Sequence, residues 1–316
     1  MAATSIPATA STAEAAGAGT LWRPTAPCTP QACVEATGRA AAAPLAVLRV
    51  AAVVLLLIVG FLVSPLGARI PARLVRRWCR WVVRAAGVRV RIDGGAAPDR
   101  GLLLVANHIS WLDIPLLAAV RPARMLAKSE IRQWPVAGWL TARSGALFID
   151  RDRIRALPDT VARIAEALRA GDAVAVFPEG STWCGRAQGP FRRAAFQAAL
   201  DAGVPVQPVR LRYRTAGGAP STAPAFVGDD SLLTSVWRVA ATRGLVAEVE
   251  VRNAIEADSH PDRRSLSRTA ESSVLPGTWP ARACDGLRRP VPVLAERGLG
   301  GVGQSAPAGS CEVVSA

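Results

Sequence analysis

The alternation of apolar and polar positions divides the 316-residue chain into four parts. Residues 1–43 are rich in Ala, Thr, Pro and Gly with little apolar periodicity, and residues 275–316 are rich in Gly, Pro and Ser. Neither stretch supplies the apolar surface that a packed core needs, so we expect both to be disordered tails. Between them we expect membrane-associated helices over 44–87 and one folded domain over 88–274.

An uncharged apolar run covers residues 50–68. At about 1.5 Å of rise per residue, it is just long enough to cross the hydrocarbon core of a bilayer as a helix. One arginine precedes the run and six follow it between residues 69 and 84, which places its C-terminal side in the cytoplasm under the positive-inside rule. Pro65 and Gly67 would also permit a turn, so a spanning helix and a half-inserted hairpin both fit the sequence.

The next stretch, residues 71–87, has the pattern of a basic amphipathic helix. Apolar residues, Trp78 and Trp81 among them, recur at helical spacing, and arginines fill much of the remainder. This pattern is typical of a helix in the membrane interface, with tryptophans at the headgroup level and guanidinium groups near lipid phosphates. The alternative is a solvated basic helix packed on the domain, and the adjacent apolar run favours the membrane.

From residue 88 onward, strand-like and helix-like segments alternate. Short apolar runs predict strands over residues 88–92, 102–106, 125–127, 146–150, 173–177, 206–213 and 245–251. Apolar stripes at helical spacing predict helices over residues 157–170, 192–202 and 262–274. This order indicates an α/β domain with helices on both faces of a sheet, in which functional groups gather at the carboxyl ends of strands.

Composition narrows the classes of function. The net charge of +14 comes almost wholly from arginine, Lys128 being the only lysine. Aromatic and basic residues do not interleave as they do in nucleic-acid-binding proteins, so we expect a lipid surface as partner and no nucleic acid. The six cysteines are scattered without a CxxC pair and there are two histidines, so we expect reduced structural thiols, no metal and no cofactor.

The stretch with the most chemistry is NHISWLD, residues 107–113, which lies between an apolar strand and the start of a helix. A loop leading into a helix can bring the carboxylate of Asp113 onto the imidazole of His108. That contact holds one tautomer and leaves the other ring nitrogen free as a general base. Alternatively, the two side chains cap the helix and satisfy a buried donor, and the local sequence favours neither interpretation.

Three further stretches carry polar groups near strands. The first, GALFIDR, ends in Arg151. Its guanidinium group either makes a bidentate contact with a phosphate or lies on the surface beside two aspartates. In the second, AVFPEGST, the strand breaks and presents Glu179, Gly180 and Ser181, a turn that offers backbone N–H groups to an anion and a carboxylate to a hydroxyl or an arginine. The third, GVPVQPV over residues 203–209, has two prolines and either lines a substrate channel or forms an edge strand.

Together, the four stretches resemble the motifs of the glycerolipid acyltransferases, the family that includes 1-acyl-sn-glycerol-3-phosphate acyltransferase. N-H-x4-D matches residues 107–113, G-x-x-F-I-D-R matches 145–151, F-P-E-G-[ST] matches 177–181 and V-P-[IV]-x-P-V matches 204–209. The resemblance covers roughly residues 88–253 and implies that the folded domain over 88–274 is an acyltransferase domain. It implies an α/β fold of the glycerol-3-phosphate acyltransferase type, a mixed sheet flanked by helices, behind an N-terminal membrane-associated helical segment.

The resemblance also implies a reaction, and the arginine excess after the apolar run places the catalytic domain on the cytoplasmic face of the cell membrane. A fatty acyl group would move from acyl-CoA or acyl carrier protein to the free hydroxyl of a lysophospholipid, without an acyl-enzyme. His108, oriented by Asp113, would take the hydroxyl proton.

The remaining motif residues would bind the substrates. Arg151 would hold the acceptor's phosphate, and the turn of Glu179, Gly180 and Ser181 would complete that pocket. Backbone N–H groups near Asn107 and Gly180 are candidates for the oxyanion hole. Lys128 is expected either as a second cation or as a surface residue.

The sequence departs from one family pattern. Members that use lysophosphatidate often continue the third motif as F-P-E-G-T-R-S, whereas Thr182 and Trp183 follow Ser181 here. The expected acceptor is 1-acyl-sn-glycerol-3-phosphate, giving phosphatidic acid, with Arg186, Arg192 or Arg193 supplying the missing cation. The alternative acceptor is another lysolipid such as lyso-ornithine lipid.

Two other classes of protein stay open. A non-catalytic membrane lipid-binding protein would carry a degenerate site, which the complete motifs disfavour. A serine hydrolase would use Ser110 or Ser181, but the chain has no G-x-S-x-G elbow, and its second histidine, His260, lies near a terminal helix.

Overall fold

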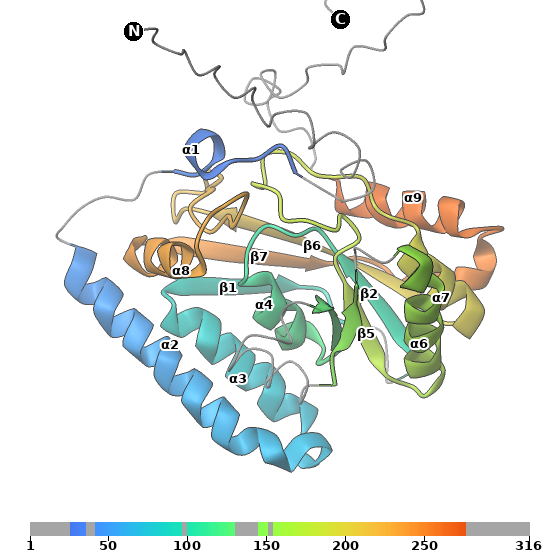
Figure 1. Cartoon of the computed structure of the whole chain (residues 1–316). Helices are drawn as coiled ribbons and strands as arrows, with labels where there is room; N and C mark the ends of the chain where they lie inside the picture. The colour runs from blue at the N-terminus through green and yellow to red at the C-terminus, as the bar shows by residue number, and fades with distance from the viewer. Residues whose placement is uncertain (1–25, 36–41, 97–99, 130–144, 151–153, 276–316) are drawn as a thin grey trace, which may run out of the picture.

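The computed structural model of the chain describes residues 26–35, 42–96, 100–129, 145–150 and 154–275 (Figure 1). Its centre is a seven-stranded sheet in the order β1-β7-β6-β2-β5-β3-β4. All neighbouring strands are parallel except β6 and β7, so the sheet is mixed, as predicted. The strands are β1 (Val88–Asp93), β2 (Leu102–Ala106), β3 (Arg124–Lys128), β4 (Leu147–Ile149), β5 (Ala173–Val176), β6 (Val206–Arg214) and β7 (Leu245–Val251).

Helices cover both faces of the sheet, and the central strand β2 shows why. Its side chains alternate between two cores: Leu102 and Leu104 pack in one, and Leu103 and Val105 in the other, all fully buried. Helices α3 (Ala72–Ala85) and α4 (Asp113–Val120) lie over the first core. Over the second lie α6 (Leu157–Arg169), α7 (Ala194–Ala202) and α9 (Arg263–Val274). The short helix η4 (Ile154–Ala156) directly precedes α6, and η5 (Ala257–Ser259) lies between β7 and α9.

A helical hairpin precedes the sheet. The helix α2 (Ala43–Val63) continues into a 3-10 helix, η2 (Ser64–Arg69), and the turn at Gly67, whose φ is +50°, returns the chain along α3. The two helices approach closely at Gly60, where an added Cβ would lie 2.5 Å from the ring of Trp78. The predicted turn is therefore present, and the apolar run forms one helix of this hairpin.

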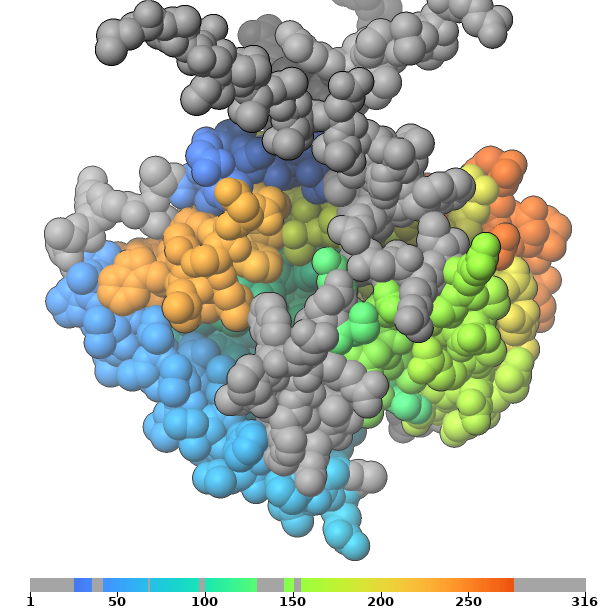
Figure 2. All heavy atoms as spheres, in the orientation of Figure 1, coloured from blue at the N-terminus to red at the C-terminus, as the bar shows by residue number. Residues whose placement is uncertain are grey.

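The apolar side of α2 is exposed over most of its length. Residues 43–67 have a mean hydropathy of 2.9 over the most apolar window, of which 11% is buried, so this stretch is long and apolar enough to cross a membrane. On its inner side, Arg49 donates to the carbonyl oxygens of Ala240 and Thr242 at 2.7 and 2.9 Å, at the end of α8 (Leu232–Ala241), a helix that the sequence did not predict. Figure 2 shows α2 and α3 along the lower left edge of the molecule.

The expectation of a disordered tail over residues 1–43 is wrong for residues 26–35, which we call the N-terminal segment. It contains the short helix α1 (Pro30–Cys33), capped by the Thr29 hydroxyl, and packs on the domain so that Cys28 and Cys33 are buried. Thr29 followed by Pro30 is a helix-start signal that the low periodicity concealed. Residues 1–25 and 276–316 lie outside the described part of the chain.

The stretch at residues 203–209 is not an edge strand. It leads into β6, which lies between β2 and β7, with Val206 opposite Leu103 and Val209 opposite Val251. The two prolines fit because their carbonyl oxygens still pair: Pro205 accepts from Leu103, and Pro208 accepts from Arg252 just beyond β7. β6 therefore begins beside the start of β2 and continues past the carboxyl end of that strand, close to the loop that carries the first motif.

Candidate active site

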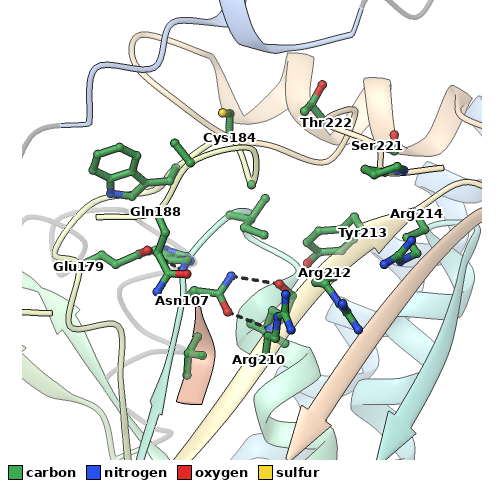
Figure 3. A pocket seen from close by; sticks show the side chains of 18 residues that line it. Asn107, Glu179, Cys184, Gln188, Arg210, Arg212, Tyr213, Arg214, Ser221 and Thr222 are labelled. Carbon is green, nitrogen blue, oxygen red and sulfur yellow. Dashed lines mark hydrogen bonds between the residues drawn. The ribbon is translucent and has the colours of Figure 1, made fainter. Parts of the chain in front are cut away.

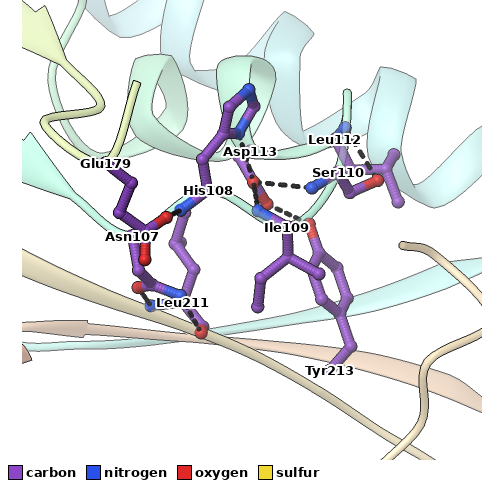
Figure 4. A network of polar contacts seen from close by, with 9 residues as sticks. All are labelled: Asn107, His108, Ile109, Ser110, Leu112, Asp113, Glu179, Leu211 and Tyr213. Atoms are coloured by element: carbon purple, nitrogen blue, oxygen red, sulfur yellow. Dashed lines mark hydrogen bonds and ion pairs between the residues drawn. The ribbon is translucent and has the colours of Figure 1, made fainter. Parts of the chain in front are cut away.

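His108 lies in the loop between β2 and α4, two residues beyond the strand (Figure 4). Its Nδ1 is 2.8 Å from Oδ2 of Asp113, the first residue of α4, whose side chain is fully buried. The same Oδ2 accepts the backbone N–H groups of Ile109 and Ser110, at 2.6 and 2.8 Å. The Asp113 carboxylate therefore orders the loop and orients the imidazole, whereas α4 has no side-chain cap, and the role of His108 as a base stays a prediction.

Tyr213, on β6, completes the surroundings of Asp113. Its hydroxyl donates to Oδ1 at 2.6 Å, and the tyrosine is buried. Burial, followed by the negative charge of Asp113, holds the pKa of Tyr213 well above its usual range, so the hydroxyl keeps its proton and acts as a donor. Sequence reasoning missed this residue, since it lies 100 positions from Asp113 and belongs to no motif.

The loop after β5 holds the main chain of His108 at both ends. Glu179 accepts the His108 N–H at 2.7 Å and the Gly189 N–H at 3.1 Å, and the Trp183 N–H donates to the His108 carbonyl at 2.8 Å. The imidazole also stacks on Phe177, with ring centroids 3.9 Å apart and planes 10° from parallel. The third motif therefore fixes the position of the first.

Glu179 is almost completely buried, which raises the pKa of its carboxyl to about 8 against the stabilising effect of its two backbone N–H partners. Gly180 adopts a φ of +77°, and its N–H donates to the Phe177 carbonyl at 3.1 Å, closing the turn that the proline and glycine predicted. Ser181 follows in this turn and is partly exposed. Their proposed contacts with substrate stay predictions.

Asn107 is held by the backbone of β6. Its amide nitrogen donates to the Leu211 carbonyl at 3.0 Å, and its amide oxygen accepts the Leu211 N–H at 2.8 Å. The side chain thus extends the hydrogen bonding between β2 and β6 by one residue and keeps the loop between β2 and α4 in register with the sheet. The expected oxyanion role concerned backbone N–H groups near this residue, and it stays a prediction.

Of the two predicted cations, the structure describes only Lys128. Lys128 is exposed at the end of β3 and lies opposite Ile149 of β4, so the chain leaves both strands at the same edge. Arg151 lies outside the described residues. Lys128 does not line the cavity described next.

A cavity of about 220 Å³ reaches Asn107, His108 and Glu179 from the side of β6 (Figure 3). Three arginines of alternate β6 positions line it: Arg210, Arg212 and Arg214. They pair with two glutamates of β7, Glu248 and Glu250.

Positive charge exceeds negative charge along this row of arginines. Burial first, and then the neighbouring arginines, lower the pKa of Arg210 to about 10. The alternation Arg-x-Arg-x-Arg, which directly follows the fourth motif in the same strand, could have predicted this row from the sequence. The row offers guanidinium groups to an anionic part of a substrate.

Comparison with known proteins identifies a family and named relatives. The Acyltransferase family matches residues 87–212. The lyso-ornithine lipid O-acyltransferase of Pseudomonas aeruginosa is 40% identical over 205 residues, which cover 64% of this chain and 77% of the relative. The 1-acyl-sn-glycerol-3-phosphate acyltransferase of Neisseria meningitidis is 36% identical over 197 residues, or 62% of this chain and 76% of that protein.

The fold has a counterpart among solved structures. The crystal structure of the 1-acyl-sn-glycerophosphate acyltransferase of Thermotoga maritima matches with a TM-score of 0.50 at 20% sequence identity, over 72% of this chain and 94% of that one. At this identity the match concerns the fold alone. The level of identity to the relatives, together with the motifs, shows the family. The chain belongs to the glycerolipid acyltransferase family, whose members are enzymes.

Proposed function

We propose that the protein transfers a fatty acyl group from the thioester of acyl-CoA or acyl carrier protein to the free hydroxyl of 1-acyl-sn-glycerol-3-phosphate, giving phosphatidic acid. The observation that carries the reaction is the 2.8 Å contact between His108 Nδ1 and the buried, fully hydrogen-bonded carboxylate of Asp113. This carboxylate fixes the imidazole with Nε2 as the free base and stabilises the imidazolium once it forms.

The steps balance without a covalent enzyme intermediate. Nε2 of His108 takes the proton of the acceptor hydroxyl as its oxygen attacks the thioester carbonyl. The tetrahedral oxyanion collapses, the carbon–sulfur bond breaks, and the imidazolium returns the proton to the leaving thiolate. Tyr213 and two backbone N–H groups donate to Asp113, which keeps its carboxylate in position beside the imidazole throughout.

A second acceptor, lyso-ornithine lipid, has specific support. The P. aeruginosa relative is named for that lipid, and Thr182 here replaces the arginine that often follows the third motif in enzymes that use lysophosphatidate. A phosphate monoester needs more positive charge than an amino-acid headgroup, which carries its own ammonium group. Arg151, together with the row Arg210, Arg212 and Arg214, is the candidate source of that charge for lysophosphatidate.

The same proposal places the enzyme on the cytoplasmic face of the cell membrane. The exposed apolar side of α2 supports insertion, and the arginines of α3 that are exposed, Arg73, Arg76, Arg77, Arg80 and Arg84, support contact with anionic headgroups. The arginine excess that follows the apolar run favours the cytoplasmic leaflet.

The test is a panel of lysolipid acceptors given with acyl-CoA or acyl carrier protein, with mass spectrometry of the products. We expect diacyl lipid and free thiol, highest with lysophosphatidate. His108→Ala should lower kcat by about a thousandfold, since general-base catalysis is worth roughly this factor. His260→Ala is the matched control, because it removes the other histidine, which contacts Ser259 and Thr269, and should leave the rate unchanged.

Each other outcome identifies an alternative. Release of free fatty acid instead of diacyl lipid would indicate a hydrolase that uses Ser110 or Ser181. Binding without turnover of any acceptor would indicate a lipid-binding protein. Preference for lyso-ornithine lipid would keep the mechanism and replace the acceptor.

A further inference from the structure

Three cysteines that are far apart in the sequence meet at the edge of the cavity. Cys28 and Cys33 come from the N-terminal segment, and Cys184 comes from the loop after β5 that also carries Glu179 and Trp183. All three are buried, and their sulfur atoms lie within 4.8 Å of one another. Figure 1 shows the N-terminal segment crossing over the loops at the end of the sheet, and Figure 3 places Cys184 at the end of the cavity nearest this segment.

We propose that Cys28, Cys33 and Cys184 bind one thiolate-preferring metal ion, Zn²⁺, which fastens the N-terminal segment to the loop after β5. Zinc–sulfur bonds of about 2.3 Å in a tetrahedral site separate the sulfurs by roughly 3.8 Å, so the observed spacing needs only a small contraction. Among the described residues, no fourth His, Cys, Asp or Glu joins the group, which leaves one coordination position for water or another small ligand.

Backbone donors already surround the sulfurs in the way that ligated thiolates require. The N–H groups of Arg186 and Ala187 donate to Cys184, that of Cys184 donates to Cys28, and that of Thr29 donates to Cys33. Such hydrogen bonds stabilise negative charge on sulfur and orient ligands around a metal.

The burial of the three sulfurs favours a cation among them. Three buried thiolates without a cation would be costly, whereas zinc binding releases the thiol protons and supplies the compensating charge.

Further contacts hold the N-terminal segment against the domain. Gly228 adopts a φ of +62°, and a Cβ added there would lie 3.2 Å from the Cys28 carbonyl oxygen, so the segment packs closely on the domain. The Glu35 carboxylate accepts the Ser221 hydroxyl at 2.9 Å and the Thr222 N–H at 3.3 Å. The sulfurs are thus brought together by a defined backbone path.

The experiment uses the full-length protein in detergent and a non-thiol reductant. After chelation and desalting, the protein is given Zn²⁺, the excess is removed, and bound metal is measured by mass spectrometry of the elements. A Co²⁺ titration in parallel reports thiolate ligands by their charge-transfer absorption. We expect about one metal ion per chain, with proton release on binding.

Serine variants identify the ligands. Cys28→Ser, Cys33→Ser and Cys184→Ser should each weaken Zn²⁺ binding by at least about tenfold and remove most of the cobalt–thiolate absorption. Cys79→Ser is the matched control, because Cys79 is buried in α3 outside this group, and it should bind as the unsubstituted protein does. Circular dichroism verifies that each variant is folded. The cobalt spectrum of the unsubstituted protein tests for thiolate ligands independently of any variant.

Three results would overturn the proposal. The first is a reduced, folded protein that binds neither Zn²⁺ nor Co²⁺ through thiolates. The second is equal loss of binding in Cys79→Ser. The third is a disulfide between two of the three cysteines, detected as resistance to alkylation before reduction. None of these outcomes bears on acyl transfer, which is measured separately.

Discussion

At the scale of single residues, the surroundings of Asp113 explain how a fully buried carboxylate can orient the partly buried imidazole of His108. Four donors converge on it: the His108 ring, two backbone N–H groups and the Tyr213 hydroxyl. A buried charge is stable only when such partners satisfy it. The loop is therefore ordered by the same group that orients the imidazole.

We therefore expect Tyr213 to be a positioning residue that acts through Asp113. Tyr213→Phe removes one hydrogen bond to a charged group, which costs about 1–3 kcal/mol of stability. We expect kcat to fall by about tenfold with KM little changed, because the imidazole loses orientation while the substrate-binding surfaces remain. Steady-state kinetics and thermal unfolding measure the two effects. An unchanged kcat in a destabilised protein would show that the hydroxyl is structural only.

Glu179 gives the enzyme a pH-dependent stability. Its carboxyl has a pKa of about 8 in the folded protein against an ordinary value of 4.5, so the folded state keeps a proton that the unfolded chain releases between these values. Its contribution to the free energy of unfolding is therefore complete below pH 4.5 and is lost as the pH rises through about 8.

Denaturant titrations from about pH 5 to pH 8 test this sign. Glu179→Gln cannot titrate, and it also loses one backbone partner, so we expect it to be less stable than the unsubstituted protein at pH 5. The difference in unfolding free energy between them should shrink as the pH rises. Glu166→Gln, on the exposed side of α6, is the control. Parallel curves for the protein and the Glu179 variant would contradict the prediction.

At the scale of elements, α2 presents an apolar surface that water does not favour. Its inner side is used: Ala46 and Val53 are buried, and Arg49 binds the end of α8. Its outer side exposes Leu55 and Leu62 by 62% and 68%. Exposed apolar area of this extent marks a surface for lipid or a partner.

Leu55→Gln together with Leu62→Gln should therefore weaken binding to lipid vesicles without unfolding the domain. Each buried leucine contributes about 1.5–3 kcal/mol on transfer from water, so we expect affinity to fall by at least about tenfold. Vesicle co-sedimentation measures this. Leu275→Gln, an exposed leucine after α9, is the control and should bind normally. Equal binding by all three proteins would exclude α2 as the lipid contact.

At the scale of the whole molecule, local patterns predicted the strands and the order of the motifs but not the contacts between distant segments. The run at residues 245–251 coincides with β7, and the helix at residues 157–170 is within one residue of α6, because apolar periodicity and a terminal glycine fix such elements locally. The His108–Asp113 contact was foreseen because its two residues are neighbours in one loop.

The other parts of the site depend on sheet order, which no local pattern encodes. Tyr213 reaches Asp113 only because β6 lies beside β2, and Cys184 meets Cys28 only because the N-terminal segment crosses the loops. A segment of low periodicity was taken for a tail although its cysteines are buried, since tertiary packing holds it in place. Arg151 remains a prediction.

The two hydrogen bonds to the main chain of His108 have a practical consequence for crystallography. Glu179 and Trp183 bind its N–H and carbonyl, not its side chain, so removing the imidazole should leave the loop in place. His108→Ala is therefore suited to trapping the intact acyl donor and the acceptor side by side in one crystal. Such a complex would give the stereochemistry of the attack directly, before any acyl group has moved.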